Sequence, residues 1–154
     1  MSIEIARTYL ARFGRENDIR ELDASSATVP LAAQALGVEE ARIAKTLTFH
    51  GGEGCILIVT AGDKKIQNAK FRARFGCKAK MLSPEEALAF TGHAVGGVCP
   101  FGITDPRVEI YLDVSLQRFS TVFPAAGSSN SAIEMTCAEL ASISRSRDWV
   151  DICI

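Results

Sequence analysis

Two strand-like runs on either side of a glycine-rich reversal constrain the fold of this chain more than any other feature. Residues 43–49 (IAKTLTF) and 55–60 (CILIVT) are both typical of β-strands. The residues between them, HGGEG, suit a tight reversal. The sequence therefore predicts a β-hairpin in the middle of the chain.

Helices and further strands alternate around this hairpin. Helical spacing or capping signals predict four helices: residues 3–13 with Gly14 as C-cap, the TVPLAAQALGV segment ending near Gly37, residues 84–90 behind the Ser83 capping box, and residues 137–143 behind the Thr136 capping box. Short strands are expected at IRELD, VEIYLDV, FSTVF, SAIEM and WVDICI. The short turns between strands argue against a doubly wound parallel sheet. They favour an α/β (α+β) fold with a mixed, largely antiparallel, curved sheet flanked by helices.

Length and composition indicate one globular domain over residues 1–154, with 47% hydrophobic and 23% charged residues. The N-terminus lacks the apolar run of a signal peptide, and no apolar stretch reaches the roughly 20 residues of a membrane span, so a cytoplasmic protein is expected. The five cysteines show no CxxC spacing and the two histidines are far apart. We therefore expect no disulfide framework, no zinc site and no cofactor.

The net charge of −1 hides a segregation of charge along the chain. Residues 64–80 hold seven basic residues and no acidic one, which leaves 10 basic against 18 acidic residues elsewhere. The segment is either a solvated helix face or a patch for phosphates. Phe71 and Phe75, four residues apart, are expected to anchor a helix to the core.

Lys45 is the first candidate functional residue. Period-2 alternation places it on the strand face of Ile43, Leu47 and Phe49. A buried ammonium must pair with a carboxylate, extend to an edge, or line a cavity where a ligand supplies the partner. These three alternatives stay open on the strand pattern alone.

Two glycine-bearing segments suit close approach of a ligand to the main chain. Residues 95–103 (VGGVCPFGI) contain three glycines and a proline, and exposed N–H groups there could bind an anion or an oxyanion. His93, just before this loop, is expected to be a polar residue of its rim. Residues 123–131 (FPAAGSSNS) add hydroxyls and an amide, which suit either a small polar ligand or ordinary turns.

Three segments in this order, RIAKTLTF, VGGVCPFG and FPAAGSSNSAIEMTCAEL, resemble the YbaK/ProX-type trans-editing aminoacyl-tRNA deacylases. These are relatives of the editing domain of bacterial prolyl-tRNA synthetases, and the likeness spans about residues 25–145. The resemblance implies a partly closed mixed β-structure flanked by helices. It also implies metal-free hydrolysis, in trans, of a small amino acid wrongly attached to a tRNA, most typically proline tRNA.

Roles for particular residues are assigned from the chemistry of the matched segments. Lys45 matches the signature lysine of the family and would position the terminal nucleotide or polarise the ester, and the N–H groups around Gly97 would hold the substrate carbonyl or ribose. Catalytic roles are therefore assigned to Lys45 and Gly97. Substrate-binding roles are assigned to Gly96, Val98, Cys99, Pro100, Phe101, Gly102, Thr28, Gly127, Ser128, Ser129 and Asn130.

Several alternatives stay open. Ser128, Ser129 and Ala132 stand where cysteinyl-tRNA-type members carry basic residues and an aspartate, so alanine, cysteine, serine, threonine or a non-protein analogue could be the amino acid removed. Affinity for tRNA would come from a synthetase partner or from the basic segment. Cys99 could be a nucleophile, although neither histidine is tied to it by sequence, and an inert side chain is favoured. A non-catalytic tRNA- or nucleotide-binding module is the alternative to an enzyme.

Overall fold

The hairpin at residues 43–60 is the centre of the fold. In the computed structural model, which describes residues 2–154, it consists of β2 (Ile43–Gly51) and β3 (Gly54–Ala61), antiparallel with Gly51 opposite Gly54. Gly52, in the turn, has φ +59°, a conformation that glycine adopts without a Cβ penalty. The predicted hairpin is confirmed.

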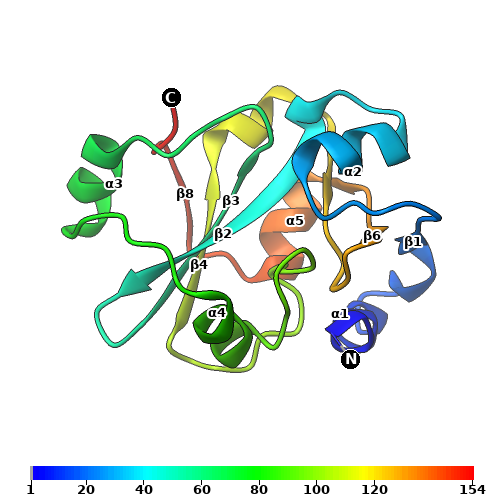
Figure 1. Cartoon of the computed structure of the whole chain (residues 1–154), viewed down its shortest axis with the longest axis horizontal. Coiled ribbons are helices and arrows are strands. Elements are labelled where there is room, and N and C mark those ends of the chain that lie inside the picture. The colour runs from blue at the N-terminus through cyan, green and yellow to red at the C-terminus, as the bar shows by residue number, and fades with distance from the viewer. Residues whose placement is uncertain (1) are drawn as a thin grey trace.

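Eight strands and five α-helices make up the described part of the chain (Figure 1). The remaining strands are β1 (Arg20–Glu21), β4 (Val108–Asp113), β5 (Thr121–Pro124), β6 (Ser131–Ala132), β7 (Met135–Thr136) and β8 (Asp148–Val150). The helices are α1 (Ser2–Ala11), α2 (Val29–Leu36), α3 (Asn68–Phe75), α4 (Pro84–Thr91) and α5 (Cys137–Ser144). Single 3-10 turns are η1 (Glu16–Asp18), η2 (Glu40–Arg42) and η3 (Val114–Arg118).

The main sheet is mixed and curled into part of a barrel, with strand order β7-β5-β2-β3-β4-β8. A second, two-stranded sheet pairs β1 with β6 antiparallel. In the main sheet β2–β3 and β5–β7 are antiparallel, whereas β2–β5, β3–β4 and β4–β8 are parallel. Parallel neighbours need crossover connections, and α3 and α4 lie in the one between β3 and β4. The expected mixed sheet flanked by helices is confirmed.

Both faces of the hairpin are covered. The larger core includes Leu57 and Val59 of β3 and packs against α1 and α5. The opposite face, with Ile56 and Ile58, packs against α3. Phe71 of α3 is fully buried, and its ring centre lies 5.0 Å from that of Phe49 and 4.8 Å from that of Phe75, with the rings tilted in both pairs. The expected role of the two phenylalanines as anchors is confirmed.

The capping boxes at Ser83 and Thr136 are both present and begin α4 and α5. The predicted SAIEM strand is instead divided into β6 and β7. β6 joins β1 while β7 joins β5, so the chain changes partners at Ile133 and Glu134. Pairing partners of this kind lie far away in sequence, which a local pattern does not encode.

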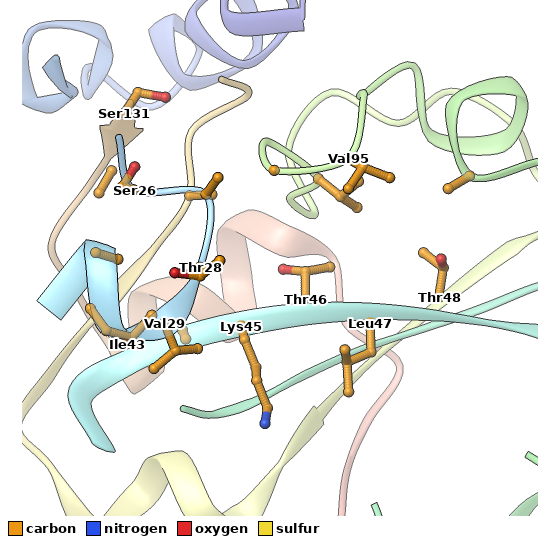
Figure 2. Close-up of a pocket in the computed structure, with 18 of the residues that line it drawn as sticks. Ser26, Thr28, Val29, Ile43, Lys45, Thr46, Leu47, Thr48, Val95 and Ser131 are labelled. Atoms are coloured by element: carbon orange, nitrogen blue, oxygen red, sulfur yellow. The ribbon is translucent and has the colours of Figure 1, made fainter. Parts of the chain in front are cut away.

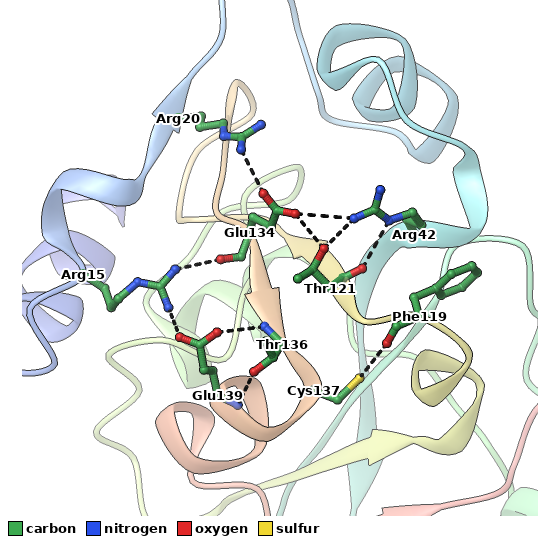
Figure 3. Close-up of polar contacts among 9 residues, drawn as sticks. All are labelled: Arg15, Arg20, Arg42, Phe119, Thr121, Glu134, Thr136, Cys137 and Glu139. Atoms are coloured by element: carbon green, nitrogen blue, oxygen red, sulfur yellow. Dashed lines mark hydrogen bonds and ion pairs between the residues drawn. The ribbon is translucent and has the colours of Figure 1, made fainter.

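A polar cluster holds this divided strand in place (Figure 3). The Glu134 carboxylate accepts hydrogen bonds from Arg20 at 3.0 Å, Arg42 at 3.4 Å and the Thr121 hydroxyl at 2.6 Å. Arg15 donates to the Glu134 carbonyl at 2.7 Å and pairs with the Glu139 carboxylate. The cluster joins β1, η2, β5, β7 and the first turn of α5.

Candidate functional site

A cavity of about 410 Å³ opens beside the outer edge of β2. Its other walls are α2, the start of α4, the loop at residues 95–98 and the segment from Phe123 to Ala132 (Figure 2). The apolar wall includes Val29, Ala32, Leu36, Leu82, Ala87 and Phe123, and polar side chains include Thr28, Thr46, Thr48 and Ser131. An apolar hollow with a few polar groups is the usual form of a small-molecule site.

The cavity coincides with a gap in the pairing of β2. β5 pairs with the outer edge of β2 only at Ile43 and Ala44. Pairing resumes further along, where Leu82 donates to the Thr48 carbonyl at 3.1 Å and His50 donates to the Lys80 carbonyl at 2.8 Å. Main-chain groups two residues apart face the same side of a strand, so the N–H and C=O of Thr46 face this unpaired edge.

Thr46 also has an unpartnered side chain. Its Oγ1 is shielded from solvent and has no hydrogen-bond partner within residues 2–154. Figure 2 shows the Thr46 side chain on the cavity side of β2, across from Thr28 and Val95. Since buried polar groups are almost always bonded, the hydroxyl is a ready donor or acceptor for a molecule in the cavity.

The glycine loop forms the wall opposite Thr46. Gly96 has φ +95° and, with Val95 and Val98, lines the cavity. The N–H groups of Gly96 and Val98 donate to no protein acceptor in the described chain. The loop can therefore present two free main-chain donors.

Gly97 has a structural part in this loop, whereas the prediction gave it a contact with the substrate. Its N–H donates to the Ala94 carbonyl at 3.0 Å, so it does not serve as a free donor. A Cβ on Gly97 would lie 2.7 Å from the main chain of Gly127 and of Ser128. The absence of a side chain allows the two glycine-bearing segments to touch.

The Lys45 ammonium lies outside the cavity. Lys45 contributes to the cavity wall, but its Nζ donates to the Lys64 carbonyl on the other face of β2. In Figure 2 the side chain points away from Thr46 and Val95. Burial lowers the pKa of this ammonium, and the nearby Cys153 and Asp63 oppose that shift. The catalytic roles assigned to Lys45 and to the loop around Gly97 require both to reach one hollow, but in this structure the face of Thr46, and not the Lys45 ammonium, meets the loop.

Residues 99–102, which follow the loop at residues 95–98, do not line the cavity. Cys99 and Phe101 are fully buried in the main core, and burial raises the pKa of the Cys99 thiol to about 12. The thiol is therefore protonated and inaccessible, which disfavours the nucleophile alternative. Pro100 and Gly102 line a separate hollow of about 320 Å³ near Tyr9, and neither they nor Phe101 line the cavity of Thr46.

His93 ties the two ends of this loop together and does not lie on its rim as expected. Its side chain is fully buried, with Nε2 2.8 Å from the Phe101 carbonyl and 3.5 Å from the Cys99 sulfur. Burial lowers the pKa of His93, so the ring is neutral, and its Nε2–H donates to the carbonyl. Nothing in the local sequence indicates a bond to Phe101.

The predicted polar residues of the 127–130 turn support the rim without lining the cavity. Ser128 donates to Asn130 at 2.9 Å, and the Asn130 amide donates to the Leu22 carbonyl at 3.1 Å. The Ser129 carbonyl accepts from the Ser26 N–H at 2.6 Å. Gly127, with φ +96°, packs against the Ser2 carbonyl. These contacts hold the segment that carries Thr28, whose hydroxyl also caps α2.

Of the predicted residues, the structure brings Thr28, Gly96, Val98 and the main chain of Lys45 together at the cavity. It adds Thr46, Thr48, Ala125, Ser131 and Ala132, which were not predicted as site residues. The strand pattern separates Thr46 from Lys45, but it does not indicate which of the two faces meets the glycine loop. Within residues 2–154, no three His, Cys, Asp or Glu side chains are placed to hold a metal ion. None of the described helices is long and apolar enough to cross a bilayer.

Known proteins resemble this chain in both sequence and fold. Residues 23–143 match the family of the aminoacyl-tRNA editing domain. The Bacillus subtilis protein YwhH is 57% identical over 99% of this chain and 98% of its own length. An Enterococcus faecalis protein named "Putative Cys-tRNA(Pro)/Cys-tRNA(Cys) deacylase EbsC" is 31% identical over 67% of this chain and 63% of its own. A solved structure described as "Crystal structure of a putative trans-editing enzyme for prolyl tRNA synthetase" superposes with TM-score 0.88 and 31% identity over 98% of this chain and 96% of that chain.

Proposed function

Since the chain belongs to the aminoacyl-tRNA editing domain family, we propose that it hydrolyses the ester that joins a wrongly attached small amino acid to the 3′-terminal adenosine of a tRNA. The reaction would occur in trans, with proline tRNA as the proposed carrier. The names given to the Enterococcus relative and to the superposed structure support this choice. Alanine, cysteine, serine and threonine are the proposed acyl groups.

The cavity beside Thr46 is the observation that carries this proposal. Its volume of about 410 Å³ suits a small acyl group and part of a ribose. Its walls combine methyl groups, such as those of Ala32 and Ala132, with the hydroxyls of Thr46 and Ser131. Such walls accept a short side chain and offer partners to a polar one.

The proposed chemistry is direct attack of water on the ester. The water oxygen bonds to the carbonyl carbon, the carbonyl becomes an oxyanion, and the tetrahedral intermediate then breaks the bond to the ribose oxygen. One proton of the attacking water passes to the departing ribose oxygen, which leaves as a hydroxyl, and the other is released to solvent as the amino acid leaves as a carboxylate. We assign the free N–H groups of Gly96 and Val98 to the oxyanion and the N–H and hydroxyl of Thr46 to the substrate. Fixed donors of this kind stabilise the developing charge.

For Lys45 we propose a contact made only when substrate is bound. Its ammonium donates to one neutral acceptor, the Lys64 carbonyl, on the far face of β2, while the residue itself contributes to the cavity wall. A hydrogen bond from a charged donor is worth about 1.5–3 kcal/mol. A phosphate or a polarised ester offers the ammonium a stronger partner, so we propose that the side chain turns around this edge to reach it.

The test is a panel of tRNAs charged with alanine, cysteine, serine or threonine. We expect the chain to accelerate release of at least one of these amino acids from proline tRNA. Loss of a preorganised donor costs roughly 10²–10³ in rate, so Thr46→Val should reduce the rate by a factor approaching this range, and Thr46→Ser should restore it. Binding of charged tRNA without hydrolysis would point to the non-catalytic module instead. Loss of the amino acid at the buffer rate in every case would contradict the proposal.

A further inference from the structure

The basic segment 64–80 folds into α3 and an extended connection to α4. Figure 1 shows this connection passing β2 on its way from α3. Along it Cys77 and Ala79 pack against the core beneath α3, whereas Lys78 and Lys80 are exposed. Alternate residues of an extended chain share one side, so the two lysines face solvent together, roughly 7 Å apart along the chain.

The cations of this segment fall into two groups. Lys70 bonds to Asp151 at 3.2 Å, and Arg74 pairs with Asp148 at 3.3 Å, so both are occupied within the protein. The exposed cations that form no ion pair with any residue from 2 to 154 include Arg72, Lys78 and Lys80. We call these last three the basic strip.

The basic strip ends at the rim of the cavity. The Lys80 carbonyl bonds to His50 of β2, and the next residue, Met81, pairs with Phe49 and lines the cavity. Met81 is 58% exposed. A chain entering the cavity from this side would therefore pass Lys80 first.

The charges around the strip favour a polyanion. Glu86 of α4 is the acidic group nearest in sequence that interacts with Lys80. Its carboxylate is engaged by the Ser83 N–H, whose hydrogen bond is the main cause of its lowered pKa. Outside residues 64–80 the chain carries 10 basic against 18 acidic residues, a net negative charge that disfavours binding of a nucleic acid to the rest of the molecule. A local basic surface on an acidic protein both attracts and orients such a partner.

From this placement we infer that the basic strip binds backbone phosphates of the tRNA acceptor stem while its 3′ end occupies the cavity. The inference rests on the proposed function and extends it from the acyl group to the body of the substrate. Lysine and arginine contacts to phosphates release counterions, so they supply affinity that falls steeply with salt. The strip would then supply the tRNA affinity without a further domain.

The test measures binding of uncharged proline tRNA at increasing salt. The double variant Lys78→Gln/Lys80→Gln should weaken binding about tenfold at low salt and reduce the slope of log affinity against log salt by about 2. The matched control is Lys70→Gln/Arg74→Gln, which removes the same charge from cations already paired with Asp151 and Asp148. The control should change the salt slope by much less.

A second readout separates this inference from the proposed function. Hydrolysis of a small aminoacyl-adenosine ester should be the same for the wild type and the Lys78→Gln/Lys80→Gln variant, because this substrate lacks the stem. Equal weakening by the control pair or an unchanged salt slope in the Lys78→Gln/Lys80→Gln variant would overturn the assignment of phosphate binding to the basic strip. A wild type that hydrolyses no ester would overturn the proposed function. The salt slopes would still show whether the basic strip binds tRNA phosphates.

Discussion

At the scale of single residues, the Lys45 ammonium is a charge held beside the cavity by one neutral partner. If it moves to the substrate as proposed, Lys45→Met should lower kcat/KM for charged tRNA by roughly 10²-fold or more, as expected for loss of a charged donor in a preorganised site. Thermal unfolding should change little, because the methionine keeps the stem of the side chain, and losing the bond to the Lys64 carbonyl is offset by no longer burying a charge. Full activity of Lys45→Met would show that the ammonium stays on the far face of β2.

His93 gives a prediction on stability and pH. Burial places its pKa in the folded protein below the ordinary value near 6.5. Below pH 6.5 the unfolded chain therefore binds a proton that the folded chain does not. The contribution of His93 is complete above this pH and is lost as pH falls, by up to about 1.4 kcal/mol per pH unit.

Denaturant titrations between pH 7.5 and 5 should show this loss in the wild type. His93→Gln should flatten the pH dependence, because glutamine does not titrate, and its amide can still donate to the Phe101 carbonyl. His93→Phe should also flatten it, but should reduce kcat as well, since the loop loses its cross-link. An equally steep decline in all three proteins would exclude His93 as its source.

At the scale of elements, the contact between the two glycine-bearing segments sets the shape of the site. Gly97→Ala would place a methyl group 2.7 Å from the main chain of Gly127 and of Ser128. Main chain does not yield as a flexible side chain does, so unfolding free energy should fall by about 1–3 kcal/mol. The loop should also move off its position opposite Thr46, which would lower kcat/KM.

Gly14→Ala is the matched control for that variant. Gly14 has φ +69°, and a methyl group added there would meet no atom within 4 Å, so alanine carries a backbone cost without a clash. We expect a loss of about 1 kcal/mol in stability with unchanged kinetics. If Gly97→Ala behaved in the same way as Gly14→Ala, the close contact would have no part in the reaction.

The elements themselves were largely predictable from local signals, and the site was not. Capping boxes at Ser83 and Thr136 and the glycine reversal at Gly52 act within a few residues, so the helices and the hairpin followed from sequence. The part of β2 whose main-chain groups stay unpaired and border the cavity depends on where β5 stops pairing with it, and β5 lies more than 70 residues away in sequence. Alternation separated Lys45 from Thr46, but only this distant pairing shows that the face of Thr46 meets the loop.

At the scale of the whole molecule, two cores on opposite faces of one sheet support two parts of the proposed substrate surface. The larger core carries the glycine loop, and the smaller one carries α3 and the start of the basic strip. Ile152 belongs to the smaller core. It is fully buried, its N–H donates to Asp113 at 3.0 Å, and its carbonyl accepts from Gln67 at the start of α3.

Ile152→Ala should therefore destabilise the protein by about 2–5 kcal/mol, the range for removing a buried aliphatic side chain. Ile154→Ala is the control, because that side chain is 70% exposed and its loss should change stability by less than about 0.5 kcal/mol. Urea unfolding of the three proteins gives the comparison. Equal stability of both variants would show that the C-terminal segment does not hold α3.

The break in hydrogen bonding along β2 has a consequence for how such proteins diversify. Peptide groups are present whatever amino acid occupies a position, so a reaction centre built from them survives many substitutions. The neighbouring side chains are then free to vary. Under the proposed function, replacing a methyl by a hydroxyl, or a small residue by a larger one, would alter which acyl group enters while the main-chain donors stay the same.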